Sequence, residues 1–237
     1  MKAMILAAGL GTRLKPFTNK HPKALAQVNG KSLLQRNIEY LASFGITDVI
    51  VNVHHFADQI IDSIKKNNGF GSDITISDER NEVLETGGGL KKASDFFDDE
   101  PFVLMNADIL TDMDLQKIIN AHSSSNALVT LAVAVRKTTR YFLFDELNIL
   151  CGWRNTDTND QKINREAPGY FEKAFWGIHI ISPEIFNLIT QEGKFSIVEV
   201  YMSLAKTHNI IGFEDNHSKF IDVGKPESIA LAEELFL

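Results

Sequence analysis

The segment Leu6-Ala7-Ala8-Gly9-Leu10-Gly11-Thr12-Arg13-Leu14-Lys15-Pro16 decides the fold of this chain. It joins a short apolar run to a glycine turn and a cationic side chain, and the pair Pro22-Lys23 follows soon after. Glycines let the backbone approach an anion closely, and consecutive backbone amides form a cradle for phosphate. Because Arg13 and Lys23 would place positive charge beside that cradle, the segment predicts a nucleoside triphosphate site.

The glycine pattern differs from two common phosphate-binding motifs. It is not a Walker A loop, which requires G-x-x-x-x-G-K-[ST]. It also departs from the dinucleotide-binding fingerprint, because Leu14 stands where the third glycine belongs, and this disfavours a dehydrogenase. Taken alone, the two glycines are also compatible with an ordinary tight turn after a buried strand.

The composition predicts one large core. With 237 residues, of which 44% are hydrophobic, we expect a single α/β domain over 1–237. The net charge of −7 argues against a nucleic-acid partner. The single cysteine, Cys151, fits a reducing cytoplasm, and no apolar run approaches the ~20 residues that cross a bilayer, so no membrane partner is expected. The oligomeric state stays open.

Strand-like and helix-like segments alternate through 1–125. Continuous apolar runs predict strands, at 4–8, 49–53, 74–77 and 102–106. Apolar residues at helical spacing predict helices, at 32–44, 56–64 and 90–97, the last entered through Gly87-Gly88-Gly89. Thr111 with Asp114 predicts a capping box before a further helix. This alternation indicates a mostly parallel sheet covered on both faces, with ligands at the carboxyl ends of its strands.

The half 126–237 is richer in strands. Its apolar or alternating runs predict strands, at 128–135, 141–145, 149–153 and 171–181. The polar, turn-rich stretch 155–169 is interpreted as an exposed loop or flap. Helices are predicted at 183–190, 196–207 and 226–235, and the β-rich middle is interpreted as a lobe of the same domain.

Four motifs, in this order, resemble the signature of the sugar-1-phosphate nucleotidylyltransferases. They are the 6–16 segment with Pro22-Lys23, the run Glu85-Thr86-Gly87-Gly88-Gly89, Asn106-Ala107-Asp108, and Phe220-Ile221-Asp222-Val223-Gly224. The resemblance covers essentially the whole chain and is greatest for the compact bacterial subgroup that includes N-acetylmuramate 1-phosphate uridylyltransferase. It implies a three-layer Rossmann-like nucleotidyltransferase fold, with a mostly parallel mixed sheet and a small β-rich sugar-binding lobe.

The resemblance also implies a reaction and a site. A sugar 1-phosphate would attack the α-phosphorus of a nucleoside triphosphate, with UTP as the first candidate, and pyrophosphate would leave. Arg13 and Lys23 would be catalytic, and Asp108 and Asp222 would hold Mg²⁺, a cation that prefers oxygen ligands. The expected nucleotide-binding residues are Ala7, Ala8, Gly9, Gly11, Thr12, Glu85, Thr86, Gly87 and Asn106. The expected sugar-binding residues are Gly88, Lys173 and Gly177.

The chain departs from the family pattern around its expected sugar site. Larger relatives carry Glu-Lys-Pro before the strand with its glycine, whereas here Glu172-Lys173 is followed by Ala174, only four residues from Gly177. Ala107 replaces a usual glycine, and Phe220 replaces a usual tryptophan. Open alternatives are a mannose-1-phosphate guanylyltransferase, a glucose-1-phosphate thymidylyltransferase, a phosphocholine cytidylyltransferase and a sensor that binds nucleotide sugars without catalysis.

Overall fold

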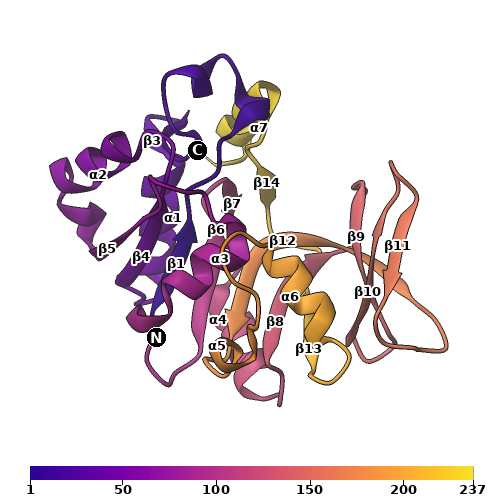
Figure 1. The fold of residues 1–237 in the computed structure, drawn as a ribbon. Helices are drawn as coiled ribbons and strands as arrows, with labels where there is room; N and C mark the ends of the chain where they lie inside the picture. Colours follow the sequence, from indigo (N-terminus) through magenta and orange to yellow (C-terminus); the bar gives the residue numbers. More distant parts are fainter. Residues whose placement is uncertain (237) are drawn as a thin grey trace.

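The computed structural model describes residues 1–236 as a mixed β-sheet with helices on both faces (Figure 1). The strands are β1 (Ala3–Leu6), β2 (Gln27–Val28), β3 (Lys31–Ser32), β4 (Asp48–Val53), β5 (Asp73–Asp78), β6 (Phe102–Asn106), β7 (Ile109–Thr111), β8 (Val129–Ala134), β9 (Arg140–Phe144), β10 (Leu150–Asn155), β11 (Asp160–Ile163), β12 (Phe171–Ile181), β13 (Ile210–Glu214) and β14 (Phe220–Asp222). The helices are α1 (Leu33–Ser43), α2 (Ala57–Lys66), α3 (Glu85–Lys92), α4 (Leu115–Ser123), α5 (Ile185–Leu188), α6 (Ile197–Leu204) and α7 (Pro226–Leu235).

Ten of the strands form one sheet that runs through both halves of the chain. Its main order is β11-β10-β9-β12-β6-β1-β4-β5, and β8 pairs with β12 and β13. Strands β6, β1, β4 and β5 are parallel neighbours, and β12 joins them antiparallel to β6. The predicted α/β class with a mixed sheet is confirmed, and strands β9 to β11 extend the sheet at the side of the second half (Figure 1).

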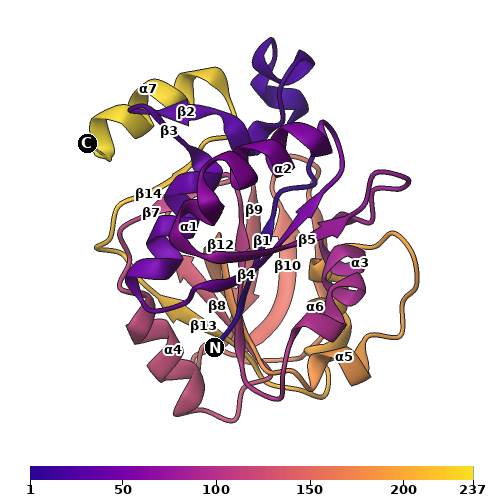
Figure 2. The same cartoon turned by 90° about the vertical axis from the view of Figure 1, so that its left-hand side faces the viewer.

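The sheet separates two hydrophobic clusters, each covered by its own helices. Buried residues of α1, α2 and α4 pack with one cluster, and those of α3, α5 and α6 pack with the other. Figure 2 shows these helices on opposite sides of the strands. This is the three-layer arrangement expected when strands and helices alternate along a chain.

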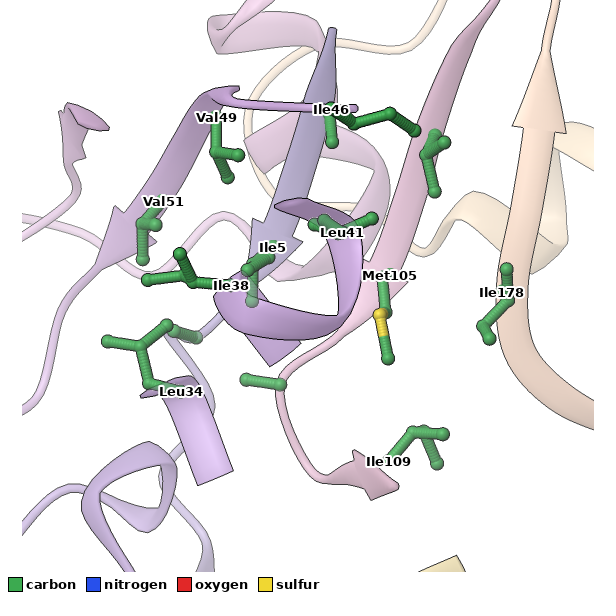
Figure 3. Packing of buried hydrophobic residues seen from close by; sticks show 14 of the residues in the cluster. Ile5, Leu34, Ile38, Leu41, Ile46, Val49, Val51, Met105, Ile109 and Ile178 are labelled. Atoms are coloured by element: carbon green, nitrogen blue, oxygen red, sulfur yellow. The ribbon is translucent and has the colours of Figure 1, made fainter. Parts of the chain in front are cut away.

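Helix α1 illustrates how the sequence forms these layers. The Ser32 hydroxyl caps the helix by accepting a hydrogen bond from the Gln35 amide at 3.1 Å. Leu34, Ile38 and Leu41 recur at helical spacing and are fully buried against the sheet, as Figure 3 shows. Because each such side chain contributes about 1.5–3 kcal/mol on burial, this face fixes the helix above β1 and β6.

A third, smaller cluster fixes the segments that carry the expected site residues. Leu14 is 1% exposed, and it packs in one cluster with Val28, Ile221 and Val223. Residues of α7 complete this cluster at the top of Figure 1. The cluster therefore holds the first loop and β14 in the same neighbourhood.

The sequence predicted that the glycine run precedes a helix. In the structure the run lies inside a helix. Helix α3 begins at Glu85 and contains Gly87, Gly88 and Gly89, all of which are buried. Glycine has a low intrinsic helix propensity, so the local sequence predicted a turn here. Tertiary packing overrides that low propensity. Neighbouring groups lie so close to the helix that side chains at the three glycine positions would clash with them.

Two further local predictions were wrong. The stretch 155–169 is not all loop, because β11 pairs with β10 in antiparallel register, Asp160 opposite Asn155. Thr111 belongs to β7 and forms no capping box; Asp114 itself caps α4 by accepting from the Gln116 amide at 3.1 Å. Within residues 1–236, no helix has both the length and the apolar character needed to cross a bilayer.

Candidate active site

A cavity of about 550 Å³ opens at the carboxyl ends of β1 and β6. It brings together most of the residues that the sequence predicted for the nucleotide. Its lining includes Ala7, Ala8, Gly9, Gly11, Thr12, Lys23, Glu85, Thr86, Asn106 and Asp108. The cavity lies where an α/β sheet places its ligands, because loops diverge beyond the strand ends.

The first loop presents free backbone amides to this cavity. Within residues 1–236, the N–H groups of Gly9, Leu10 and Gly11 donate to no protein acceptor. The preceding amides of Ala7 and Ala8 are not available, since both donate to Asn52 Oδ1, at 2.7 and 3.2 Å. The amides left free for an anion are therefore those of Gly9, Leu10 and Gly11, the glycine turn where the sequence predicted the cradle.

Asn52 is a site residue that the sequence analysis did not identify. It is 2% exposed, and its Nδ2 donates to Glu79 Oε1 at 2.8 Å. Glu79, also 2% exposed, accepts in turn from the Leu84 amide just before α3. This buried network connects the first loop to α3. The signal in the sequence was a lone amide within the apolar strand 48–53.

Gly11 is the glycine of the loop that needs its special conformation. Its φ of 61° lies in the left-handed region, and an added Cβ would stand 2.8 Å from the Cβ of Lys23. The Thr18 hydroxyl donates to the Gly11 carbonyl at 2.9 Å. The turn therefore closes directly over the stem of Lys23 and directs its ammonium group toward the strand ends.

The two predicted metal ligands face the same cation. Lys23 Nζ donates to Asp108 Oδ2 and lies 3.7 Å from Asp222 Oδ1. Backbone pairing produces this convergence, because β14 pairs with β7 and the Val223 amide donates to the Asp108 carbonyl at 2.9 Å. Two carboxylates from distant parts of the chain thus share one small space.

The charges of the two carboxylates oppose each other. Partial burial and the charge of Asp108 raise the pKa of Asp222, and Lys23, Arg13 and Arg136 oppose that rise. Among residues 1–236, no three His, Cys, Asp or Glu side chains form a complete metal site. Two carboxylates fit Mg²⁺ nevertheless, because this ion is commonly held by one or two carboxylates together with substrate phosphates and water.

The glycines of α3 are not among the residues that line the cavity. A Cβ on Gly87 would stand 2.5 Å from the Phe195 ring, and one on Gly88 would stand 2.1 Å from the Gly193 carbonyl oxygen. Their amides donate to the Phe195 carbonyl, at 2.9 and 3.2 Å. The structure thus places both glycines against the 193–197 segment, whereas Glu85 and Thr86 reach the cavity.

The structure separates the other two predicted sugar contacts. Gly177, with a φ of 73°, lies against Asn106, since an added Cβ would stand 2.8 Å from Asn106 Nδ2. Lys173 does not join them. It is 7% exposed, its ammonium group donates to Glu214 and Asn148, and it lines a different cavity. The prediction that Lys173 contacts the sugar phosphate finds no support in this arrangement.

Free amides and a lysine that line one cavity, with two carboxylates that meet at that lysine, are parts that phosphoryl-transfer enzymes use. A sequence model described as nucleotidyl transferase matches residues 2–144. N-acetylmuramate alpha-1-phosphate uridylyltransferase of Caulobacter vibrioides is 32% identical over 240 residues, 98% of this chain and 95% of that protein. Mannose-1-phosphate guanyltransferase of Yarrowia lipolytica is 29% identical over 241 residues, all of this chain but 64% of that longer protein.

Solved structures agree with these sequence matches. HddC from Yersinia pseudotuberculosis, in its complex with GMP-PN, superposes with a TM-score of 0.79 at 28% identity, covering 100% of this chain and 99% of that one. This chain therefore belongs to the nucleotidyl transferase family.

Proposed function

We propose that this protein transfers a nucleotidyl group from a nucleoside triphosphate, UTP in the first place, to a sugar 1-phosphate. The products would be a nucleotide sugar and pyrophosphate. The observation that carries the proposal is the meeting of Asp108 and Asp222 at Lys23, beside the free amides of Gly9 to Gly11. Residues 1–125 would hold the nucleotide, and 126–237 would supply the sugar side and the second carboxylate.

The proposed reaction explains why the cavity contains cations but needs no strong base. A phosphate monoester is largely ionised near pH 7, because its second pKa is about 6. The protein then has to align two anions and stabilise the charge that develops on the departing pyrophosphate. In the proposal the loop amides and Arg13 hold the triphosphate, and Lys23 lies between the nucleotide and the incoming phosphate.

The carboxylates complete the proposed site. Mg²⁺ bound by Asp108 and Asp222 would supply charge neutralisation to the triphosphate. The donor set supports this assignment, since both carboxylates face one cation and belong to a pair in which the pKa of Asp222 is raised by burial and by its neighbour. Two hard anionic ligands suit Mg²⁺ better than a softer transition metal.

A guanylyl donor is the second candidate. The Yarrowia relative is named as a guanyltransferase, and the Yersinia structure holds GMP-PN. A thymidylyl donor and a phosphocholine acceptor are further alternatives from the sequence. We expect the enzyme to work in the cytoplasm and to supply a nucleotide sugar for the cell envelope.

A substrate matrix tests the proposal. Pyrophosphate release would be measured for UTP, GTP, dTTP and CTP, each with several sugar 1-phosphates and with phosphocholine, with and without Mg²⁺. We expect turnover with a sugar 1-phosphate that stops when EDTA removes the metal. Turnover with phosphocholine alone would contradict the sugar assignment, and binding of nucleotide sugars without turnover by any pair would indicate a sensor.

A further inference from the structure

The proposed reaction brings a second anion, the sugar 1-phosphate, to the site, whereas Lys173 is paired within the protein and lines a different cavity. The Lys173 ammonium group is buried and donates to Glu214 and Asn148. Its hydrogen bond also lowers the pKa of Glu214, so the two charges stabilise each other. If Lys173 left this pair, the negative charge of Glu214 would lose its positive partner. The second half of the chain therefore needs another cation for the sugar phosphate.

Arg136 is a cation of that half that lies over the ring of Phe220, two residues before Asp222. It follows β8, and its guanidinium carbon lies 4.8 Å from the centroid of the Phe220 ring. Phe220 and Asp222 are two positions apart on β14, so their side chains share one face of that strand. The charges of Arg136 and Asp222 act on each other.

The aromatic partner of Arg136 is itself held in place. The Phe220 ring stacks on Trp176, with centroids 4.7 Å apart and planes inclined by 26°. Trp176 is 2% exposed and directly precedes Gly177, the sugar-side residue that lies against Asn106. The Arg136 guanidinium, the Phe220 ring and the Trp176 ring are therefore linked by two successive contacts, and we name this group the 136–220–176 stack.

The guanidinium keeps donors free for a ligand. Its Nη2 donates to the Phe175 carbonyl at a long 3.4 Å, and within residues 1–236 no carboxylate lies close enough for an ion pair with it. An arginine has five N–H donors in a planar fork that matches a phosphate. A ring face fixes the plane of that fork, which lowers the entropy lost on binding.

From this geometry we propose that Arg136 binds the phosphate of the sugar 1-phosphate, in the role that the sequence assigned to Lys173. The inference rests on the proposed function, because it names a residue for the acceptor of that reaction. Arg13 would then serve the triphosphate, Lys23 would lie between the two substrates, and Arg136 would bind the acceptor phosphate from the other half of the chain.

The test compares Arg136→Gln with Lys137→Gln in the full-length protein. Both changes remove one positive charge, and Lys137 is the adjacent exposed cation, so it controls for the general electrostatic field. The KM for the sugar 1-phosphate should rise about 10- to 100-fold in Arg136→Gln, as expected for a lost charged hydrogen bond, while the KM for the nucleoside triphosphate stays within about threefold. Arg136→Lys should restore only part of the loss, because an ammonium group lacks the planar fork.

A binding measurement separates this inference from the proposed function. Isothermal titration of the metal-free protein with the sugar 1-phosphate should show weaker binding in Arg136→Gln and unchanged binding in Lys137→Gln. Equal sugar 1-phosphate KM values in wild type and Arg136→Gln, or an equal rise in Lys137→Gln, would overturn the role of Arg136. A wild type without turnover for any substrate pair would instead overturn the proposed function.

Discussion

Two glycines of this protein, Gly9 and Gly88, should respond oppositely to replacement by alanine. A Cβ on Gly9 has no neighbour within 4 Å, and this exposed residue lines the cavity. A Cβ on Gly88 would stand 2.1 Å from the Gly193 carbonyl oxygen and 3.0 Å from Leu84 Cβ. The missing side chain of Gly9 therefore leaves space for a ligand, whereas that of Gly88 leaves space for the Gly193 carbonyl and Leu84.

The structure gives the size of the Gly88→Ala effect. Relief of the contact requires a movement of roughly 1 Å between α3 and the 193–195 segment, an overpacking that typically costs about 1–3 kcal/mol. The same movement weakens the hydrogen bonds from the Gly87 and Gly88 amides to the Phe195 carbonyl, at about 1 kcal/mol each. Alanine offsets about 1 kcal/mol through its higher helix propensity. The net loss should be about 2–4 kcal/mol.

Thermal unfolding and steady-state kinetics measure both effects. For a chain of this length, a loss of that size lowers Tm by about 4–16 °C, and the KM for the nucleoside triphosphate should change little. Gly9→Ala should leave Tm unchanged or slightly raised and should increase that KM at least about tenfold, since a methyl group would keep phosphate from the loop amides. A stable Gly88→Ala enzyme with impaired substrate binding would refute this reasoning and would restore Gly88 as a ligand contact.

Three other changes test different parts of the structure. Asp222→Asn should lower kcat at least about 100-fold, because it removes a negative charge from the proposed metal site. Tm should be nearly unchanged, since folding does not require a second negative charge beside Asp108. A near-normal kcat would show that Asp222 is not a metal ligand. Asn52→Leu should destabilise the protein by about 3 kcal/mol in denaturant titrations, since the Ala7 and Ala8 amides and the Glu79 carboxylate lose their hydrogen-bond partner. An unchanged denaturation midpoint would show that these hydrogen bonds do not stabilise the fold. Burial lowers the pKa of His179 to about 3, so below pH 6.5 the unfolded chain binds a proton that the native state rejects. The free energy of unfolding should then fall by about 1.4 kcal/mol per pH unit between about pH 6 and 4 through this residue, and His179→Gln should flatten that slope; equal slopes would assign the pH dependence to other groups.

Apolar runs carried most of the fold prediction. The strands 102–106 and 171–181 and the last helix were predicted with the bounds that the structure has, because burial on one or both faces leaves a continuous signal in the sequence. The strand Asp160–Ile163 was missed, since none of its residues is buried and its polar sequence gives no strand period. Its pairing with β10 depends on the hairpin and not on its own side chains.

The site was predictable wherever one motif supplied both the residue and its surroundings. Lys23 and Asp108 follow this pattern, because a loop and a strand end place them directly. Lys173 shows the limit of the same reasoning. Glu172-Lys173 resembles an expected sugar contact only in part, since Ala174 follows it, and in the structure the Lys173 ammonium group donates to Glu214 of another strand. Lys173 and Glu214 are 41 positions apart, so the residues next to Lys173 in the sequence do not predict that they pair.

The junction of the two halves explains why the third cluster matters for chemistry. Asp222 reaches Asp108 through the pairing of β14 with β7, which joins only three residues on each strand. A pairing this short is marginal by itself. Ile221 and Val223, on either side of Asp222, are buried with Leu14, the neighbour of Arg13. Alternation along the strand then directs Asp222 away from this cluster and toward Lys23. The same hydrophobic contacts that order the C-terminal segment thus set the separation of the two carboxylates, so the position of the proposed metal depends on packing from both ends of the chain.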